Sequence, residues 1–321
     1  MGTSGGTAGE SIGEASDGAA FPRPRVVVST CLGFEACRYN GQTIPDPLVS
    51  SLRGYVDFQP VCPEVEIGLG IPREPIRIVE QEGRRSLYQP ATGREVTAEM
   101  EEFCRRYLDD VRAVDGFLLK NRSPSCGISD VKVYTGRDTS GTSRGSGFFG
   151  GAVRERFPGT ALEDEGRLKN FSIREHFLTA LFTSARHRVA AGHGTMRSLV
   201  GFHTVHKLLF MGYNQSQLRR MGRVVANHDH LEIGGVFDRY RELLSELLAK
   251  PPRFTNMINV LYHAFGGLSE GLSGEERRYF LNLIEEYRDE RVPLSVPLRV
   301  LEAWSVGQGN HYLLNQTLLK P

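Results

Sequence analysis

The chain contains five cysteines, Cys31, Cys37, Cys62, Cys104 and Cys126, and all of them lie in its first half. An odd number of cysteines in a chain of 321 residues is a poor basis for a disulfide framework. It fits a metal or cluster site in a reducing compartment better. Three of the five, Cys31, Cys62 and Cys126, each follow the end of a predicted β-strand, and we predict that they form one site.

Three thiolates are one fewer than the four that usually hold a 4Fe–4S cluster. A cluster bound by Cys31, Cys62 and Cys126 would keep one iron that the protein does not ligate. An open metal position can act as a Lewis acid, as an open zinc site does. A thiocarbonyl sulfur is a soft atom and suits such an iron. The predicted cofactor is therefore a 4Fe–4S cluster with one open iron.

Glu64 lies two residues after Cys62, and a carboxylate so near a cluster is a candidate general acid or base. Its alternative role is a structural one, as a helix cap or a partner of Arg73. Ser123 precedes Cys126 by three residues and is a second candidate catalytic residue. Its hydroxyl could bond a cluster sulfur, cap the next turn or contact the substrate.

Two polar residues and two thiols remain in this half of the chain. Lys120 and Asn121 end the third predicted strand and are candidates to contact a base or a phosphate. Cys104 lies within a predicted helix, where packing in the core is the favoured role. Cys37 is only six residues from Cys31, so a role as a further ligand stays open.

The elements that must position these residues alternate between strand and helix. Strands are predicted over Arg25–Ser29, Asp57–Val61 and Gly116–Lys120, and a helix over Thr97–Val114. This alternation predicts an α/β domain with a parallel, Rossmann-like sheet. Ligands of such sheets bind beyond the carboxyl ends of the strands, where the three cysteines lie. The glycine-rich segment Gly136–Gly151 is either a loop over the site or a plain linker.

From Phe171 onward the pattern is helical, and Ser172 to Glu175 has the form of a capping box. Further helices are predicted over Met196–Met211, Ser216–His228, Val236–Leu248, Phe254–Phe265, Gly274–Tyr287 and Pro297–Gln308. We therefore expect three regions: a disordered tail over residues 1–22, an α/β iron–sulfur domain over 23–168 and an all-α domain over 169–321.

Charge is unevenly distributed between the two halves. Residues 1–168 hold 20 Lys and Arg against 24 Asp and Glu, whereas residues 169–321 hold 19 against 14 and all nine histidines. Between Lys169 and Arg223 there are nine basic residues and one acidic residue, Glu175. Such a stretch suggests a polyanionic partner. The alternative is a basic face that docks against the acidic first half.

Phosphate contacts suit the basic residues of the predicted helices better than metal binding does. His203 and His206 are one helical turn apart, but no convincing third ligand accompanies them. The predicted RNA contacts are Arg186, Arg188, His203, Lys207, Arg219, Arg220 and Arg223.

Five motifs occur in order over about residues 24–168: Ser29 to Gly33, Cys37 to Gly41, Cys62 to Val65, Gly68 to Arg73, and Lys120 to Gly127. Together they resemble the thiouracil desulfidase family. The resemblance implies a 4Fe–4S cluster on Cys31, Cys62 and Cys126 and functional roles for Glu64 and Ser123. Many relatives have another residue at the position of Cys37, which argues against it as a ligand.

The second half is similar to a helical domain often fused behind such enzymes. The matching segments are Leu199 to Lys207, Asn256 to His263 and Tyr287 to Leu301. Such fusions resemble desulfidases that convert 4-thiouridine in tRNA to uridine, so the expected partner is thiolated tRNA and no protein partner is required. The alternatives are a desulfidase of free 2- or 4-thiouracil and a non-catalytic iron–sulfur protein that binds RNA.

The first 22 residues lack the basic and apolar regions of a signal peptide, and no apolar run reaches the ~20 residues of a membrane helix. We therefore expect a cytoplasmic protein without a membrane partner. The cysteine spacing of radical S-adenosylmethionine enzymes, C-x-x-x-C-x-x-C, does not occur.

Overall fold

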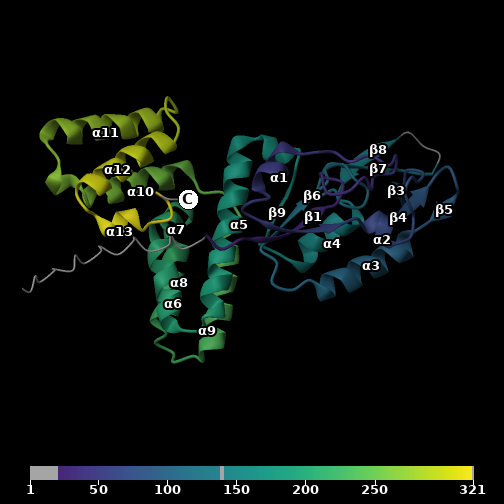
Figure 1. The fold of residues 1–321 in the computed structure, drawn as a ribbon, viewed down its shortest axis with the longest axis horizontal. Coiled ribbons are helices and arrows are strands. Elements are labelled where there is room, and N and C mark those ends of the chain that lie inside the picture. The colour runs from purple at the N-terminus through teal and green to yellow at the C-terminus, as the bar shows by residue number, and fades with distance from the viewer. Residues whose placement is uncertain (1–20, 138–140, 320–321) are drawn as a thin grey trace, which may run out of the picture.

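The computed structural model describes residues 21–137 and 141–319. Most of the predicted tail, 1–22, lies outside the described residues. Two lobes lie side by side, an α/β lobe and a helical lobe, with the long helix α5 (Phe171–Gly192) between them (Figure 1). No helix of the described segments is long and apolar enough to cross a membrane.

The first sheet is parallel, as the sequence predicts. Its order is β2-β1-β6-β9, formed by Asp57–Val61, Arg25–Ser29, Gly116–Leu119 and Ala161–Asp164. Val26 and Val28 pair in register with Phe58 and Pro60 of β2, so β1 and β2 end at the same level. Strand β1 is apolar and buried on both faces, which is typical of a central parallel strand.

A second, mixed sheet was not predicted. Its order is β5-β4-β3-β7-β8, with bounds Arg94–Glu95, Arg84–Gln89, Arg77–Gln81, Val131–Tyr134 and Thr142–Gly145. Its β4 strand carries neighbouring arginines, and β8 is polar, so neither shows the apolar alternation that identifies a strand in a sequence. The hairpin of β7 and β8 occupies part of the glycine-rich segment that was considered as a loop over the site.

Four helices accompany the strands of the α/β lobe. They are α1 (Pro47–Leu52), α2 (Pro63–Glu66), α3 (Thr97–Asp110) and α4 (Phe148–Arg156). One apolar core joins α3 and α4 to the two sheets and contains Met100, Phe103 and Phe149. Cys104 is buried in this core, which agrees with the packing role expected for it.

The other face of the parallel sheet is covered by α5. Phe177 and Leu181 of this helix pack with Val26, Val28 and Leu118 of the strands. Ala180 and Ala190 of the same helix belong to the core of the helical lobe. The predicted boundary between the α/β and all-α domains, at residues 168 and 169, therefore lies just before α5, whose side chains belong to the cores of both lobes.

The rest of the chain is helical, as predicted. After the short 3-10 helix η1 (Arg167–Lys169) and α5 come α6 (Met196–Val205), α7 (Lys207–Tyr213), α8 (Gln215–Ala226), α9 (Ile233–Leu248), α10 (Phe254–Gly266), η2 (Ser269–Gly271), α11 (Gly274–Arg288), α12 (Ser295–Gly307) and α13 (His311–Leu314).

Two local predictions in this lobe were wrong. The segment expected to form one helix over Met196–Met211 divides at His206 into α6 and α7. The expected capping box at Ser172 does not form, because Asn170 caps α5 by accepting a hydrogen bond from the Ile173 amide. A capping box does form at Ser273 of α11.

Candidate active site

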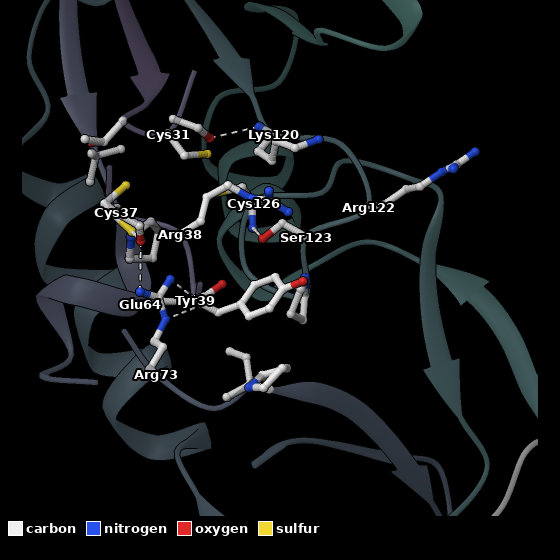
Figure 2. Close-up of a pocket in the computed structure, with 18 of the residues that line it drawn as sticks. Cys31, Cys37, Arg38, Tyr39, Glu64, Arg73, Lys120, Arg122, Ser123 and Cys126 are labelled. Carbon is white, nitrogen blue, oxygen red and sulfur yellow. Dashed lines mark hydrogen bonds and ion pairs between the residues drawn. The ribbon is translucent and has the colours of Figure 1, made fainter. Parts of the chain in front are cut away.

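A pocket of about 320 Å³ opens at the carboxyl ends of β1, β2 and β6. Its lining includes the three predicted cluster ligands, Cys31, Cys62 and Cys126, together with Glu64 and Ser123 (Figure 2). These residues are separated by up to 95 positions in the sequence. The parallel strands bring them together because each strand ends at the same edge of the sheet.

Each cysteine enters the pocket from a different kind of backbone. Cys31 is half-buried in the turn that follows β1. Cys62 is the N-cap residue of α2, and its backbone carbonyl accepts a hydrogen bond from the Val65 amide at 3.0 Å. Cys126 is buried in the loop after β6. The sulfur donors thus come from three separate segments of the α/β lobe.

Cys37 also lines the pocket, and its side chain is buried. Cys31 and Cys62 lie close enough to its thiol to shift the pKa of that thiol. The Cys62 sulfur lies 3.9 Å from the Cys37 carbonyl oxygen. A fourth thiol therefore belongs to the same site. Cys37 does not follow the end of a predicted strand, so its position in the sequence did not indicate this.

Three thiols of the pocket, Cys37, Cys62 and Cys126, have a raised pKa. The hydrogen bond to Cys31, followed by burial, raises the pKa of Cys37 to about 11. The hydrogen bond to Cys37, followed by burial, raises the pKa of Cys62. Burial raises the pKa of Cys126, against hydrogen bonds from Ser29 and Ser123 that lower it.

Glu64 is held in a fixed orientation by two partners. Arg73 donates to Oε2 from Nη2 at 2.7 Å and from Nε at 2.9 Å, and Ser125 Oγ donates to Oε1 at 2.9 Å. The Arg73 side chain is 5% exposed and the Glu64 side chain 13%. The structural alternative considered for Glu64, pairing with Arg73, is therefore present. A carboxylate has further lone pairs and can still accept a proton from the pocket.

Ser123 caps the loop that carries Cys126. Its hydroxyl oxygen accepts hydrogen bonds from the amides of Ser125 at 3.2 Å and Cys126 at 3.1 Å. The hydroxyl also bonds the Cys126 sulfur, which lowers the pKa of that thiol. Of the roles considered for it, Ser123 therefore performs that of a cap; the roles toward the cluster and the substrate stay predictions.

Ser29, which the sequence analysis did not single out, supports Cys126 from β1. Its hydroxyl hydrogen-bonds to the Cys126 sulfur and accepts from the Lys120 amide at 2.8 Å. The Lys120 ammonium forms an ion pair with Glu165 and also bonds Asn121. In the sequence, only its place at the start of the motif Ser29 to Gly33 separates Ser29 from an ordinary strand residue. Its role depends on β1 and β6 being neighbours.

The donor set suits an iron–sulfur cluster. Thiolates are the usual ligands of such clusters. No group of three His, Cys, Asp or Glu side chains in the described ranges is gathered closely enough to hold a single metal ion. A cluster spans a wider space than one ion, so thiols arranged around a pocket fit it better than thiols that converge on one point.

The predicted RNA contacts have different environments in the helical lobe. Arg188 is not free, because its guanidinium donates to both carboxylate oxygens of buried Asp115 at 2.8–3.1 Å. Arg186 is half-buried, with its guanidinium 4.8 Å from the centre of the Phe21 ring. His203 bonds the Tyr240 hydroxyl at 2.9 Å.

The four remaining candidates lie on α7 and α8. Arg220 pairs with Glu246 at 3.2 Å. Lys207, Arg219 and Arg223 are exposed and form no ion pair within the described part of the chain. Arg188 therefore follows the alternative considered for the basic stretch, since it docks against the acidic first half. Exposed cations remain on the α7–α8 surface.

Two family models match this chain. The model described as 2-thiouracil desulfurase matches residues 26–165, and the model described as a protein of unknown function, DUF1722, matches residues 207–321. The first match contains every residue of the pocket named above. The second covers most of the helical lobe.

Individual relatives agree with these matches. The uncharacterized protein YbgA of Escherichia coli is 30% identical over 126 residues, 36% of this chain and 75% of the relative. The uncharacterized protein YbbK of Bacillus subtilis is 30% identical over 131 residues, 38% of this chain and 84% of the relative. A solved structure, the [4Fe-4S]-dependent thiouracil desulfidase TudS, is 27% identical and covers 48% of this chain and 98% of its own, with a TM-score of 0.39.

The model that matches residues 26–165 describes an enzyme, which favours an enzyme over the alternative of a non-catalytic RNA-binding protein. The chain belongs to the 2-thiouracil desulfurase family, with a DUF1722 domain joined behind the enzyme domain.

Proposed function

We propose that this enzyme removes sulfur from 4-thiouridine in tRNA, leaving uridine and releasing sulfide, without net oxidation or reduction. The observation that carries the proposal is the gathering of Cys31, Cys62 and Cys126 with Glu64 and Ser123 around one pocket. Thiols supply a soft cluster site, and the carboxylate and the hydroxyl supply proton transfer. A tRNA substrate would place the enzyme in the cytoplasm.

The residues that would hold a 4Fe–4S cluster are Cys31, Cys62 and Cys126. When bound, the cluster would supply a Lewis-acidic iron that binds the thiocarbonyl sulfur and so withdraws electrons from the ring carbon. Ser29 and Ser123 stabilise the ligand set by hydrogen-bonding to the Cys126 sulfur.

Glu64 is the candidate base. Arg73 and Ser125 fix its carboxylate, so that it can orient a water molecule and accept its proton as the water oxygen bonds to the ring carbon. The carbon–sulfur bond then breaks with its electron pair on sulfur, and the sulfur takes up the two protons of the water molecule, one of them from Glu64, and leaves as hydrogen sulfide. Ser123 lines the pocket, where its hydroxyl can orient the thiolated nucleobase or donate a proton to it.

A nucleotide is favoured over a free base by the entrance to the pocket. Tyr39, Arg38 and Arg122 all line the pocket, and Tyr39 is exposed (Figure 2). The Arg38 guanidinium lies 5.4 Å from the centre of the Tyr39 ring. An aromatic ring can stack on a base that has left its helix, and guanidinium groups bind phosphates.

Phosphate binding farther along the RNA is supported by the helical lobe. Arg197, Lys207, Arg219 and Arg223 are exposed on three consecutive helices that contact one another, α6, α7 and α8. None of the four pairs with an acid elsewhere in the described residues. Unpaired cations are available to replace the counterions of a polyanion.

A free thiobase is the second candidate substrate, because the description of the matching family names 2-thiouracil itself. An anaerobic assay that compares thiolated tRNA, 4-thiouridine and free 4-thiouracil separates the two. We expect the highest kcat/KM with tRNA. The tRNA proposal is wrong if the free base is turned over as efficiently as tRNA. Cys126→Ala should lose both iron and sulfide release.

The role of the helical lobe is tested by charge reversal. Arg197→Glu, Lys207→Glu and Arg223→Glu together should weaken tRNA binding and reduce its dependence on salt, because phosphate contacts are lost. Turnover of free 4-thiouracil should stay at the wild-type level. Arg277→Glu with Arg278→Glu, on the exposed surface of α11, is the matched control and should leave tRNA affinity unchanged. Unchanged affinity in the triple variant would remove the helical lobe from RNA binding.

A further inference from the structure

The mechanism above leaves one thiol of the pocket without a function. Cys37 is 2% exposed, lines the same pocket as the three predicted ligands and carries none of the catalytic roles assigned so far. Figure 2 places its side chain beside Cys31, on the pocket wall that also carries Glu64.

Cys37 contacts one predicted ligand directly and shares the pocket with all three. The Cys62 thiol points at the Cys37 carbonyl oxygen, with 3.9 Å between sulfur and oxygen, and Cys31 and Cys126 line the same pocket. A fourth sulfur in this lining can reach a cluster that the other three hold. Cys104 shows the contrast, because it is buried among the apolar residues of α3 and α4 and does not line the pocket.

The backbone of Cys37 is tied to the catalytic side of the pocket. Arg73 donates to the Cys37 carbonyl from Nη1 at 2.9 Å, and the same guanidinium holds Glu64. Cys37 itself lies in an irregular segment between β1 and α1, whereas Cys31, Cys62 and Cys126 lie close to strand ends. Movement of the Cys37 side chain therefore leaves the sheet and the other ligands in place.

We propose that Cys37 is a displaceable fourth ligand, which binds the open iron of the cluster until the thiocarbonyl sulfur of the substrate replaces it. This inference rests on the proposed function. On binding, the Cys37 thiol loses its proton to solvent and forms one iron–sulfur bond. On displacement that bond breaks, the substrate sulfur forms the new one, and the Cys37 thiolate takes up a proton. No electron is gained or lost.

Controlled oxidation of the cluster tests this proposal without measuring activity. An iron without a protein ligand is released readily when ferricyanide oxidises a 4Fe–4S cluster, and the three-iron product has a characteristic electron paramagnetic resonance signal. Wild-type protein, Cys37→Ala and Cys104→Ala are reconstituted anaerobically, and iron, sulfide and the circular dichroism spectrum are measured first. All three should fold and hold about four iron and four sulfide per chain.

We expect Cys37→Ala to form the three-iron signal several-fold faster than wild-type protein, and Cys104→Ala to match wild type. Cys37→Ser, which keeps a weaker oxygen ligand, should fall between them. Equal rates in wild type and Cys37→Ala would overturn the proposal, as would a folded Cys37→Ala that binds no cluster, since a displaceable ligand is not required for assembly. Wild-type protein that binds no iron would instead defeat the proposed function.

Discussion

At the scale of single residues, the pocket is organised by pairs rather than by isolated groups. Glu64 is paired with Arg73, Cys126 with Ser29 and Ser123, and Lys120 with Glu165. Glu64, Cys126 and Lys120 all line the pocket, and their partners fix the orientation of these side chains from within the lining or, for Glu165, from outside it. A catalytic group held in this way loses little freedom when the substrate binds.

Replacement of Glu64 tests the base directly. Glu64→Gln keeps the shape and the hydrogen bond from Ser125 but cannot accept a proton. We expect kcat to fall by about 10²–10⁴-fold with the iron content unchanged, the range for loss of a general base. Glu66→Gln, two residues later on the exposed side of the same helix, should retain wild-type kcat. A Glu64→Gln enzyme that keeps full activity would assign Glu64 a purely structural role.

At the scale of elements, α4 supports the loop that carries Cys126. The amides of Gly147, Phe148 and Gly150 donate to the carbonyls of Gly127, Pro124 and Ser125 at 2.7–3.1 Å. A Cβ atom on Gly147 would lie 2.5 Å from the Ser125 carbonyl oxygen. Only a residue without a side chain allows this close approach of helix and loop.

Gly147→Ala should therefore displace the Cys126 loop. We expect a loss of about 1–3 kcal/mol in unfolding free energy, the usual cost of overpacking, together with reduced iron retention. Gly201→Ala is the matched control, because a Cβ there meets open space within α6. It should stabilise the protein by about 0.5–1 kcal/mol through its higher helix propensity. Denaturant unfolding and iron analysis measure both variants.

Buried histidines make α5 and α6 sensitive to acid. Burial, with a smaller contribution from Arg241, lowers the pKa of His187 to about 4, and burial lowers the pKa of His206 to about 3. The Nε2 atoms of both have no hydrogen-bond partner in the described structure. An unfolded chain takes up protons at these groups near pH 6.5, whereas the folded chain does not. Their contribution to stability is therefore complete above pH 6.5 and is lost as pH falls toward 4 and 3.

Unfolding free energies measured between pH 7.5 and pH 5 test this effect. Below pH 6.5, each such histidine should contribute a slope of up to about 1.4 kcal/mol per pH unit. His187→Phe removes the proton-binding group from its position beside Tyr240 and Phe202, so its slope should be smaller than that of wild type. His263→Phe, at an exposed site on α10, should keep the wild-type slope. Equal slopes for His187→Phe and wild type would contradict the assignment.

At the scale of the whole molecule, the two lobes are joined through α5. Its apolar residues belong to both cores, and Arg188 forms a buried, multiply hydrogen-bonded ion pair with Asp115 at the start of β6. The same arginine also donates to the carbonyl of Arg23 at 3.0 Å. These bonds fix the helical lobe to the amino ends of the parallel strands. The pocket lies at the carboxyl ends of the same strands.

Loss of this ion pair should destabilise the junction. Arg188→Ala would leave the Asp115 carboxylate, 3% exposed, with the Arg25 amide as its one hydrogen-bond donor among the residues that the structure describes. Breaking a buried pair typically costs about 3–5 kcal/mol, because a charge is left uncompensated. Arg241→Ala removes an exposed pair with Asp238 and should change stability by less than about 1 kcal/mol. If Arg188→Ala changed the unfolding free energy equally little, the apolar contacts of α5 would be sufficient to hold the two lobes together.

Much of this architecture was predictable from local sequence. The apolar runs at Arg25–Ser29 and Gly116–Leu119 identify buried parallel strands, and helical periodicity identifies most helices of the second half. Cysteines at three strand ends predict one site, because parallel strands end at a common edge. The sequence alone therefore determined the fold class and the candidate ligands.

Other features depend on contacts between distant segments, and only the tertiary structure decided them. Local periodicity does not show that Arg188 meets Asp115, that Ser29 supports Cys126, or that Cys37 joins the ligand thiols, since each contact requires a particular packing of separate elements. The mixed sheet escaped prediction partly for the same reason, because β8 and most of β4 are polar and are stabilised by pairing rather than by an apolar pattern of their own.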